Sequence, residues 1–589
     1  MPKRWILRSK VLPEIVERLP KIDRVLLQLL YARGMVDKQE IERFLDPDYQ
    51  RDIHSPFTFR HMQRAVERIA RALKNNEKIV VYGDYDADGV CATAILTETL
   101  KALGGQPDIY IPFRETEGYG LNMAAVKEIA ARGTRLMLTV DCGTTNVAEV
   151  DLAQQSGMEV IITDHHDQPP ELPRAFALIN PELRDETYPY RHLAASGVAF
   201  KLAGALLSHT RNGASLGRPA LPLGWEKWLL DLVAISTVTD MVPMLGENRV
   251  LVRFGLSVLR KTRRVGLRQL VASISSELDQ VDEETLAFQV GPRLNAAGRM
   301  NHASTAYRLL VTDDLAEAKK LSAELSQTNQ ERQRTTEAVV NEALSQIGEK
   351  PTPYLLVAQG TNWPVGILGL VAGKITDRFN RPTIAMTTSQ GRIVGSGRSI
   401  EAFDITAALG KANDYLERFG GHPQACGFTV KPAAEVADFI RTLQRLAQQQ
   451  LAERDTTRVV EVDAEVILDD INWDLVNDVD RLSPFGVGAP RPRFLSRGLR
   501  VVAVDTVGKD GQHLRLHVSH ATSTVHKTIG FRFGSWFDQL NPGDVVDLVF
   551  EVGVNQWNDS RQIELKIIDL DRSALPVRKF SRSSSKGAA

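Results

Sequence analysis

The chain has 589 residues, of which 43% are hydrophobic and 25% are charged, and its formal net charge is −1. These values predict a globular protein of several domains and exclude a uniformly basic chain, so any contact with nucleic acid must come from local patches. Its three separated cysteines exclude a disulfide framework and a cysteine-rich zinc site, and with no signal peptide or membrane-spanning stretch we expect a cytoplasmic location.

The N-terminal segment 1–55 is predicted to be helical, over residues 14–33 and 37–44. Between 56 and 260 apolar strands alternate with helices, which is typical of an α/β domain with a mostly parallel sheet. The clearest elements of this predicted domain are a helix over 61–73, a strand over 78–82, a helix over 90–103, and strands over 107–111, 136–140 and 160–163. The segment 209–224 is predicted to be a surface insertion.

A helical connector is predicted for 261–348, because residues 313–347 contain no proline and have the composition of one long helix or two. A second α/β domain is predicted for 349–453. Residues 454–572 change to short alternating strands, which is typical of a β-barrel, and the basic, polar stretch 573–589 is predicted to be a disordered tail. The predicted fold is two α/β lobes joined by a long helix, followed by an all-β barrel resembling the oligonucleotide-binding (OB) type.

Aspartates and histidines follow three of the predicted strands. The strand ends carry Asp84, Asp86 and Asp88, then Asp141, then Asp164, His165 and His166. In an open parallel sheet, ligands bind beyond the carboxyl ends of the strands. Five carboxylates and two imidazoles converging there would repel one another strongly without cations. One Asp-rich turn would be ordinary, but three such strand ends predict a metal site.

The sequence also excludes two familiar alternatives. The spacing Asp84-x-Asp86-x-Asp88 matches the start of an EF-hand loop, but the twelfth position is Ile95 and a strand precedes the motif. No GxxxxGK[ST] phosphate loop is present. A mixed Asp/His cluster instead suits two Mn²⁺ or Mg²⁺ ions, a recurring device for phosphoryl hydrolysis. Asp240, after the apolar run 232–238, is either a further ligand or an ordinary helix end.

These motifs resemble those of a known family. Residues 84–89, 141–144, 164–166 and 240 are similar to successive motifs of the DHH phosphoesterase superfamily, and 420–428 resembles the Gly-Gly-His signature of its DHHA1-type second domain. Segments 291–299, 363–369 and 484–488 are similar to the bacterial members that degrade single-stranded DNA from the 5′ end. The resemblance covers about 50 to 570. It makes 56–260 the DHH catalytic domain and 349–453 the DHHA1-type domain.

The resemblance implies a role for each matching residue. The implied metal ligands are Asp84, Asp86, Asp88, Asp141, His165 and Asp240, for two Mn²⁺ or Mg²⁺ ions per active site. Asp141 would bridge the ions, and Asp84 would either ligate or orient. Asp164 would orient the histidines from behind, and His166 would face the scissile phosphate. The implied catalytic set is Asp86, Asp88, Asp141, His165, His166 and Asp240.

Candidate contacts to DNA phosphates lie in three donor-rich segments. We expect Arg293, Asn295 and Arg299 in a glycine-bounded loop, where arginine would give bidentate phosphate contacts. We expect a second loop, after a strand, to carry Ser396, Arg398 and Ser399. In the third segment, Gly420 and Gly421 would let backbone amides approach a phosphate, with His422 donating beside them.

Two further sets of residues have an ordinary and a functional interpretation. A basic run is either a solvated helix face or a path for the DNA backbone: Arg249, Arg253, Arg260, Lys261, Arg263, Arg264 and Arg268. A set in the predicted barrel is either core or a single-strand binding surface: Arg491, Arg493, Phe494, Trp536, Trp557 and Arg561. The acidic segment 463–480 would border that surface.

We therefore expect a single-strand-specific 5′→3′ exonuclease that uses two metal ions, with single-stranded DNA as its substrate. By resemblance it would act in recombination and mismatch repair at the nucleoid, with a single-strand-binding protein and a RecQ-type helicase as partners. A monomer is the default expectation. Two alternatives stay open. One is a phosphatase of the same superfamily that acts on pyrophosphate, polyphosphate or oligonucleotides, and the other is a metal-free replication scaffold of the same fold.

Overall fold

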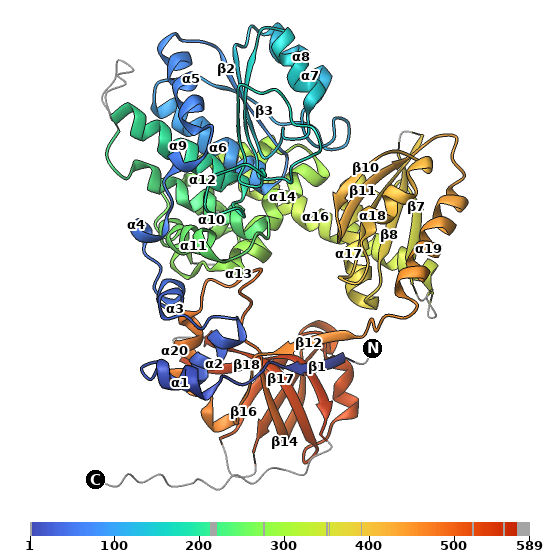
Figure 1. Cartoon of the computed structure of the whole chain (residues 1–589). Helices are drawn as coiled ribbons and strands as arrows, with labels where there is room; N and C mark the ends of the chain where they lie inside the picture. Colours follow the sequence, from blue (N-terminus) through green and yellow to red (C-terminus); the bar gives the residue numbers. More distant parts are fainter. Residues whose placement is uncertain are drawn as a thin grey trace. The chain divides into compact units, whose positions relative to one another are not determined.

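The computed structural model describes residues 3–211, 221–274, 277–348, 352, 354–389, 391–520, 524–557 and 560–573 (Figure 1). The chain forms two compact units. Residues 49–457 make the first, and residues up to 48 combine with those from 458 onward to make the second. Most of the predicted insertion 209–224, and the predicted tail after residue 573, lie outside the described residues.

A five-stranded parallel sheet begins the first unit, with strand order β3-β2-β4-β5-β6. Its strands are β2 (Ile79–Gly83), β3 (Asp108–Tyr110), β4 (Leu136–Val140), β5 (Glu159–Thr163) and β6 (Ala177–Ile179). Strands β2 and β4 are buried along their whole length, which explains their continuous apolar sequences. The parallel sheet predicted from the alternating pattern is confirmed.

Helices cover both faces of this sheet (Figure 1). One face packs against α7 (Met123–Ala131) and α8 (Val147–Gln155), whose apolar residues share a core with β2, β4 and β5. The other face carries α5 (Met62–Lys74), α6 (Ala87–Ala102) and α9 (Ala195–Arg211). The short helix α4 (Tyr49–Asp52) precedes them.

A helical region follows the sheet. It contains α10 (Leu230–Thr239), α11 (Gly246–Leu259), α12 (Val265–Ala272), α13 (Glu283–Thr285), α14 (Gly291–Met300) and α15 (Ser304–Val311). Residues 313–347, for which one long helix or two were predicted, form one helix, α16 (Leu315–Ile347), which Asp314 caps at its start. The loop predicted around 291–299 is wrong, because these residues form α14. A π-helical turn (Leu286–Val290) leads directly into α14, and Pro292 follows that turn, where the wider winding of the helix accommodates a residue without an amide hydrogen.

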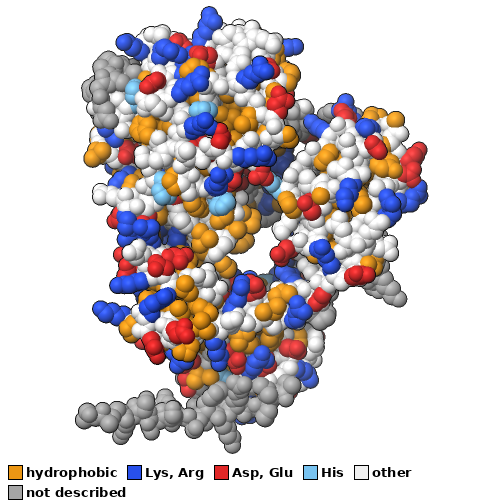
Figure 2. Space-filling view, in the orientation of Figure 1, with side chains coloured by type: hydrophobic (Ala, Val, Ile, Leu, Met, Phe, Trp, Pro, Cys, Tyr) orange, Lys and Arg blue, Asp and Glu red, His pale blue; other side chains and the backbone are white. Residues whose placement is uncertain are grey.

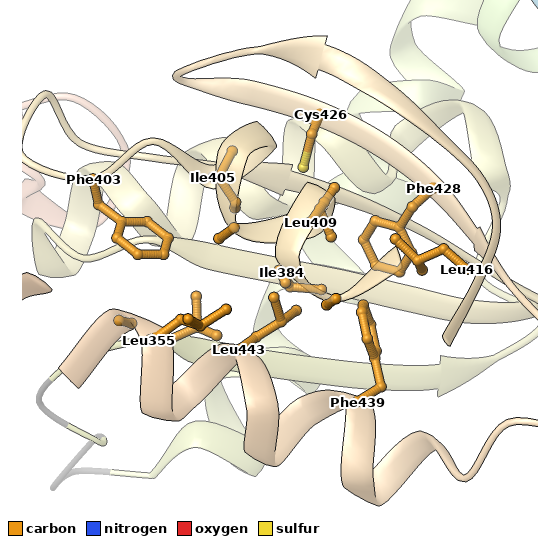
Figure 3. Packing of buried hydrophobic residues seen from close by; sticks show 14 of the residues in the cluster. Leu355, Ile384, Phe403, Ile405, Leu409, Leu416, Cys426, Phe428, Phe439 and Leu443 are labelled. Atoms are coloured by element: carbon orange, nitrogen blue, oxygen red, sulfur yellow. The ribbon is translucent and has the colours of Figure 1, made fainter. Parts of the chain in front are cut away.

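The second sheet of this unit has the order β10-β11-β9-β8-β7. Its strands are β7 (Leu356–Thr361), β8 (Thr383–Ser389), β9 (Arg392–Arg398), β10 (Leu416–His422) and β11 (Ala425–Val430), with helices α17 (Leu368–Phe379), α18 (Ile405–Lys411) and α19 (Val436–Leu451). Only β7 and β8 are parallel. Figure 3 shows Phe439 and Leu443 of α19 pointing at the sheet residues Ile384 and Phe428, which form one buried core.

The second unit contains the predicted all-β barrel, which is closed and has five strands. Its strands are β14 (Phe494–Val507), β15 (His513–Ser519), β16 (His526–Gly530), β17 (Val545–Trp557) and β18 (Ser560–Arg572). The sheet closes because β14 pairs with both β15 and β17, while β16 pairs with β18. The strand β13 (Ala464–Glu465) adds to β14, and α20 (Trp473–Arg481) lies between them in sequence.

The N-terminal segment contains a strand that the helical prediction missed. Strand β1 (Lys3–Leu7) pairs in parallel with β12 (Arg458–Val462), and the helices α1 (Pro13–Arg18), α2 (Arg24–Ala32) and α3 (Lys38–Leu45) follow it. Trp5 donates its indole hydrogen to Asp569, which fastens this strand to β18 of the barrel. Among the described residues, no helix is both long and apolar enough to cross a lipid bilayer.

Candidate functional site

The three predicted strand ends meet at one edge of the first sheet. Gly83 of β2 pairs with Val140 of β4, and Val140 pairs with Thr163 of β5. The residues that directly follow these three strands are Asp84, Asp141 and Asp164. The three aspartates are therefore side by side because the parallel register aligns the three strand ends.

Asp86 and Asp88 are fixed by two helix N-termini. Asp86 is the N-cap of α6, and its carboxylate accepts hydrogen bonds from the backbone amides of Asp88 and Gly89. This cap starts the helix at Ala87, three residues earlier than predicted. The buried Asp88 carboxylate in turn accepts hydrogen bonds from the amides of Ala195 and Ser196, at the start of α9.

Asp240 joins this group from the helical region. It is the C-cap of α10, so the apolar run before it is a helix end and not a strand end. One of its oxygens lies 3.8 Å from His165 Nε2, which also lies 3.1 Å from an oxygen of Asp141. Asp141 has a positive φ of 63°, a backbone conformation that is uncommon outside glycine and concentrates at functional sites.

Three groups of side chains have ligand atoms within 4.8 Å of one another, close enough to hold an ion. They are Asp84–Asp86–Asp141, Asp88–His165–Asp240 and Asp141–His165–His166. Asp141 and His165 each belong to two groups, so the groups form one continuous set. We call these seven residues the acidic cluster. It contains every metal ligand expected from the sequence, together with His166.

The electrostatics of the acidic cluster favour a cation. Burial and the neighbouring carboxylates raise the pKa of Asp84, Asp88, Asp141 and Asp240. Burial lowers the pKa of His165. The oxygen Oδ1 of Asp84 is buried and has no hydrogen-bond partner. An unpaired buried carboxylate oxygen among crowded acids is the environment that a divalent cation would suit.

Asp164 lies behind the two histidines, where the sequence placed it. Its carboxylate accepts hydrogen bonds from the amides of His165 and Thr144, and it lies 2.8 Å from His166 Nδ1. Burial opposes a charge on His166, but Asp164 outweighs burial and raises the histidine pKa to about 9. The hydroxyl of Tyr119 also lies 3.0 Å from His166 Nδ1. Asp164 therefore favours the charged form of His166 and engages the Nδ1 side of its ring.

Four arginines gather beside the acidic cluster. Burial, followed by the positive charges of Arg114, Arg332 and Arg398, lowers the pKa of Arg299 to about 9. Arg398 lies so close to Gly369 that a Cβ there would be 2.6 Å from its Nη2, and Arg299 donates to the carbonyl of Gly366. We call Arg114, Arg299, Arg332 and Arg398 the arginine cluster. In the described part of the chain none of the four forms an ion pair.

The arginine cluster and the acidic cluster adjoin through the loop that carries Asp84 and Asp86. The Arg114 guanidinium lies 4.8 Å from the centre of the Tyr85 ring. Asp86 acts electrostatically on Arg299, and Arg114 acts on Asp84. Uncompensated arginines therefore border a set of crowded carboxylates, which is the charge pattern that a phosphate and divalent cations would complete.

The other predicted DNA contacts bond to backbone groups of the protein itself. Asn295 accepts a hydrogen bond from the amide of Ala87, so it supports the first turn of α6. Arg293 bonds to the Gln289 carbonyl on its own helix. The loop predicted around Ser396 and Arg398 is wrong, because both lie in β9, where the Ser396 hydroxyl donates to the Cys426 carbonyl. A regular strand forms there because β8 and β11 flank it.

The Gly-Gly-His segment lies at the end of the edge strand β10. His422 Nδ1 is 3.3 Å from Asp167, which follows His166 directly in sequence. Gly421 has a φ of 144°, and a Cβ there would lie 2.2 Å from the Ala425 carbonyl oxygen, so this hairpin requires glycine. Ser399 follows β9 and donates its hydroxyl hydrogen to the Phe403 carbonyl.

The basic run is not one solvated face. Arg249 is buried, and Arg264 is paired with Asp231 of α10 and with Glu98 of α6. Figure 2 shows basic side chains interspersed with acidic ones over the visible face, rather than gathered in one basic patch. Arg249 and Arg264 therefore have structural roles, whereas Arg260, Lys261, Arg263 and Arg268 are exposed, so a path for the DNA backbone along this run stays a prediction.

The barrel residues divide between core and surface. Phe494 is fully buried and stacks on Phe550, so it belongs to the core. Arg491 lies over the Phe485 ring, and Arg561 lies over the Trp473 ring. Trp536 is half-buried beside Phe537, which is exposed. The side chain of Trp557 lies outside the described residues, and Arg493 bonds through its backbone amide to Asp463 in the acidic segment 463–480.

Sequence reasoning missed Arg114 and Tyr119. Both lie in the loop after β3, which is a fourth strand end of the same sheet. The rule that ligands bind beyond the carboxyl ends of parallel strands would have marked this loop too. The loop carries no carboxylate or imidazole that pairs with the other strand ends, so a pattern of metal ligands does not reveal it, whereas its arginine does.

Comparisons with known proteins agree with this arrangement. Family models match three segments: "DHH family, N-terminal domain" over 78–237, "DHHA1 domain" over 352–449 and "RecJ OB domain" over 462–569. The single-stranded-DNA-specific exonuclease RecJ of Bacillus subtilis is 37% identical over 551 residues, which cover 93% of this chain and 68% of that protein.

Two crystal structures of Thermus thermophilus RecJ resemble the fold over 98% of this chain. The structure in complex with Mn²⁺ has a TM-score of 0.81, 29% sequence identity and a match to 81% of its own chain. The structure in complex with Mg²⁺ has a TM-score of 0.75, 27% identity and a match to 80% of its chain.

Proposed function

Because the chain belongs to the RecJ family of single-stranded-DNA-specific exonucleases, we propose that it hydrolyses single-stranded DNA from the 5′ end with the help of two divalent cations. The observation that carries this proposal is the adjacency of the acidic cluster and the arginine cluster around the loop of Asp84 and Asp86. The acidic cluster would hold the cations that act on the cleaved phosphodiester, and the arginine cluster would bind a neighbouring phosphate.

The acidic cluster fits Mn²⁺ or Mg²⁺. Carboxylates suit both ions and the imidazole suits Mn²⁺, and the two Thermus structures are described as complexes with one or the other. Asp84, Asp86 and Asp141 would hold one ion, and Asp88, His165 and Asp240 would hold the second. When bound, two such ions supply an activated water and stabilise negative charge on the reacting phosphate. The unpaired oxygen of Asp84 supports this assignment.

His166 would act as an oriented donor. Asp164 engages Nδ1 and favours the charged imidazole, so Nε2 would be available to donate to a phosphate oxygen. Because Asp164 is itself fixed by the amides of His165 and Thr144, the ring keeps one orientation. A preorganised donor of this kind stabilises charge that develops in the transition state.

The arginine cluster would bind the phosphate at the end of the strand. DNA strands ordinarily carry a phosphate at the 5′ end and a hydroxyl at the 3′ end. A terminal phosphate has a second negative charge, and Arg114, Arg299 and Arg398 present guanidiniums without carboxylate partners to meet it. This chemistry supports the 5′→3′ direction that the family resemblance implies, and it supports release of products from an end.

The barrel would bind single-stranded DNA away from the site of cleavage, as barrels of this class do with basic and aromatic residues. By family resemblance we also expect a nucleoid-associated role in recombination and mismatch repair. The expected partners are a single-strand-binding protein and a RecQ-type helicase, and the expected oligomeric state is a monomer.

The test uses one oligonucleotide as a free strand and as a blunt duplex, labelled at either end, with Mn²⁺, Mg²⁺ or EDTA. We expect small products from the 5′ label first, from the free strand only, and only with metal. Early release of a 3′ label would overturn the direction. Hydrolysis of pyrophosphate or short nucleotides in preference to long strands would instead establish the small-substrate phosphatase. A folded protein that binds no metal and cuts nothing would establish the scaffold.

A further inference from the structure

Arg114 reaches its place in the arginine cluster from a loop that needs support. The loop leaves β3 at Tyr110 and carries Phe113 with half of its surface exposed. No ion pair fixes Arg114 among the described residues, and its guanidinium lies over the Tyr85 ring. The position of its guanidinium is therefore determined by whatever holds the loop backbone.

Glu117 holds the loop from one side. Its carboxylate accepts hydrogen bonds from the backbone amide of Phe113 at 2.7 Å and from the Tyr110 hydroxyl at 2.6 Å. These bonds close the loop on itself. They do not connect it to the helix that carries Arg299, so a second support is required to set the two arginines against each other.

His302 supplies that second support. Its Nε2 lies 3.0 Å from the carbonyl oxygen of Ile111, and its ring packs on the Phe113 ring with centroids 4.1 Å apart. The backbone amide of Ser304 donates to His302 Nδ1 at 3.1 Å. Because Nδ1 accepts that bond, the ring hydrogen is on Nε2, which donates it to Ile111. The tautomer is thus fixed by two backbone groups.

His302 also lies two residues beyond α14, the helix that carries Arg299. One side chain therefore connects the end of α14 with the loop of Arg114. We propose that His302 is a positioning residue that sets Arg114 against Arg299, and so determines how strongly the enzyme prefers a strand with a terminal 5′-phosphate. This inference rests on the proposed function, because it concerns the same phosphate site.

The alternative is that His302 only packs the loop and adds stability. The two roles differ in what a variant changes. A packing residue affects every substrate equally, whereas a positioning residue changes the ratio of kcat/KM for a 5′-phosphate strand to that for a 5′-hydroxyl strand. The measurement is this ratio, for the full chain with saturating Mn²⁺, together with the melting temperature.

The variants are His302→Ala, His302→Gln and Arg114→Ala, with His192→Ala as a matched control because His192 is an exposed histidine paired with Glu182. We expect His302→Ala to lower the ratio about tenfold, mainly through KM for the phosphorylated strand, with activity on the hydroxyl strand retained. The amide of Gln can donate where Nε2 did, so His302→Gln should recover most of the ratio. Arg114→Ala should remove the preference, and adding His302→Ala to it should lower the ratio no further.

An unchanged ratio in His302→Ala, or an equal loss on both strands with a lower melting temperature, would overturn the inference. The same holds for a further loss of the ratio in the double variant. Failure of the proposed function is distinguishable, because it is read from the unmodified protein. A protein that degrades both strands equally well lacks the phosphate site itself, and His302 then has no preference to determine.

Discussion

Gly298 of α14 packs directly against the backbone of Tyr85, so that a Cβ at position 298 would lie 2.3 Å from the Tyr85 carbonyl oxygen. This contact joins the helix of Arg299 to the loop of Asp84 and Asp86. We expect Gly298→Ala to displace that loop, because the obstructing atom belongs to the backbone and cannot rotate away. Activity should fall at least tenfold, with a destabilisation of about 1–3 kcal/mol.

The matched control is Gly204→Ala in α9, where a Cβ would meet nothing within 4 Å. In a helix this change should leave activity intact and stabilise the protein by up to about 1 kcal/mol. Nuclease assays and thermal unfolding of both variants check the prediction. Full activity of Gly298→Ala would mean that the loop tolerates a shift.

Asp141→Asn should distinguish two effects of the acidic cluster: destabilisation by repulsion between its carboxylates, and metal binding. Asparagine keeps the shape and accepts a positive φ, but it removes one of the mutually repelling carboxylates. Without metal, the variant should therefore melt at a higher temperature than the unmodified protein. With Mn²⁺, the unmodified protein should gain about 2.7 kcal/mol at a hundredfold excess over the dissociation constant, and the variant should gain little of it.

Nuclease activity of Asp141→Asn should fall by about a thousandfold or more, in line with the loss of a metal that activates water. The control is Asp167→Asn, since Asp167 lies in the same loop region as His166 but has 77% of its side chain exposed. It should keep the metal-induced rise in melting temperature. An equal rise in Asp141→Asn would contradict its role as a ligand.

Arg264 should contribute to stability and not to DNA binding. It is paired with Asp231 and Glu98, and these carboxylates outweigh burial and raise its pKa. Arg264→Gln leaves both acids without their partner and should cost about 3–5 kcal/mol. Arg268→Gln, an exposed neighbour in the same basic run, should change stability by less than about 0.5 kcal/mol.

Single-strand affinity, measured by fluorescence anisotropy over a series of salt concentrations, should have the same salt dependence in the Arg264 variant as in the unmodified protein. A phosphate contact at Arg264 would instead lower the slope by about one. That result would assign Arg264 to a path for DNA along the basic run.

The three cysteines should be unreactive in the folded protein. Cys91, Cys142 and Cys426 are all buried, and burial raises the pKa of each thiol, to about 12 for Cys426. Only the thiolate reacts, so at pH 8 the fraction of reactive sulfur is small. A thiol reagent such as DTNB should modify no cysteine rapidly in the native chain and all three in guanidinium chloride. Rapid modification of the native protein would show local opening near one of them.

The acidic cluster could be predicted because its signals are local. Each of β2, β4 and β5 is a short apolar run with an aspartate after it. The parallel register of these strands then places the three aspartates side by side. Strand β1 could not be predicted in this way, because its partner β12 is about 450 residues away and a five-residue strand has little preference of its own.

The segment 291–299 misled sequence reasoning for a different reason. Its glycines suggested a loop, but in α14 they serve close packing. A Cβ at Gly291 would lie 2.1 Å from Thr239, next to Asp240, and Gly298 meets Tyr85. A single sequence does not distinguish a glycine required for close packing from a glycine required for a turn. Only the three-dimensional neighbours distinguish them.

Helix α16 is fixed at both ends, so its length sets the distance between the two regions that it contacts. Its first half packs against α12, α14 and α15. Near its end, Gln346 bonds to both backbone groups of Gln359, and Glu342 accepts the indole hydrogen of Trp363. One inserted residue in the middle would rotate the far end by about 100° and move it by about 1.5 Å. The number of residues in α16 therefore determines the orientation of its far end. An insertion or deletion in this helix should disturb the protein as much as the loss of a ligand residue.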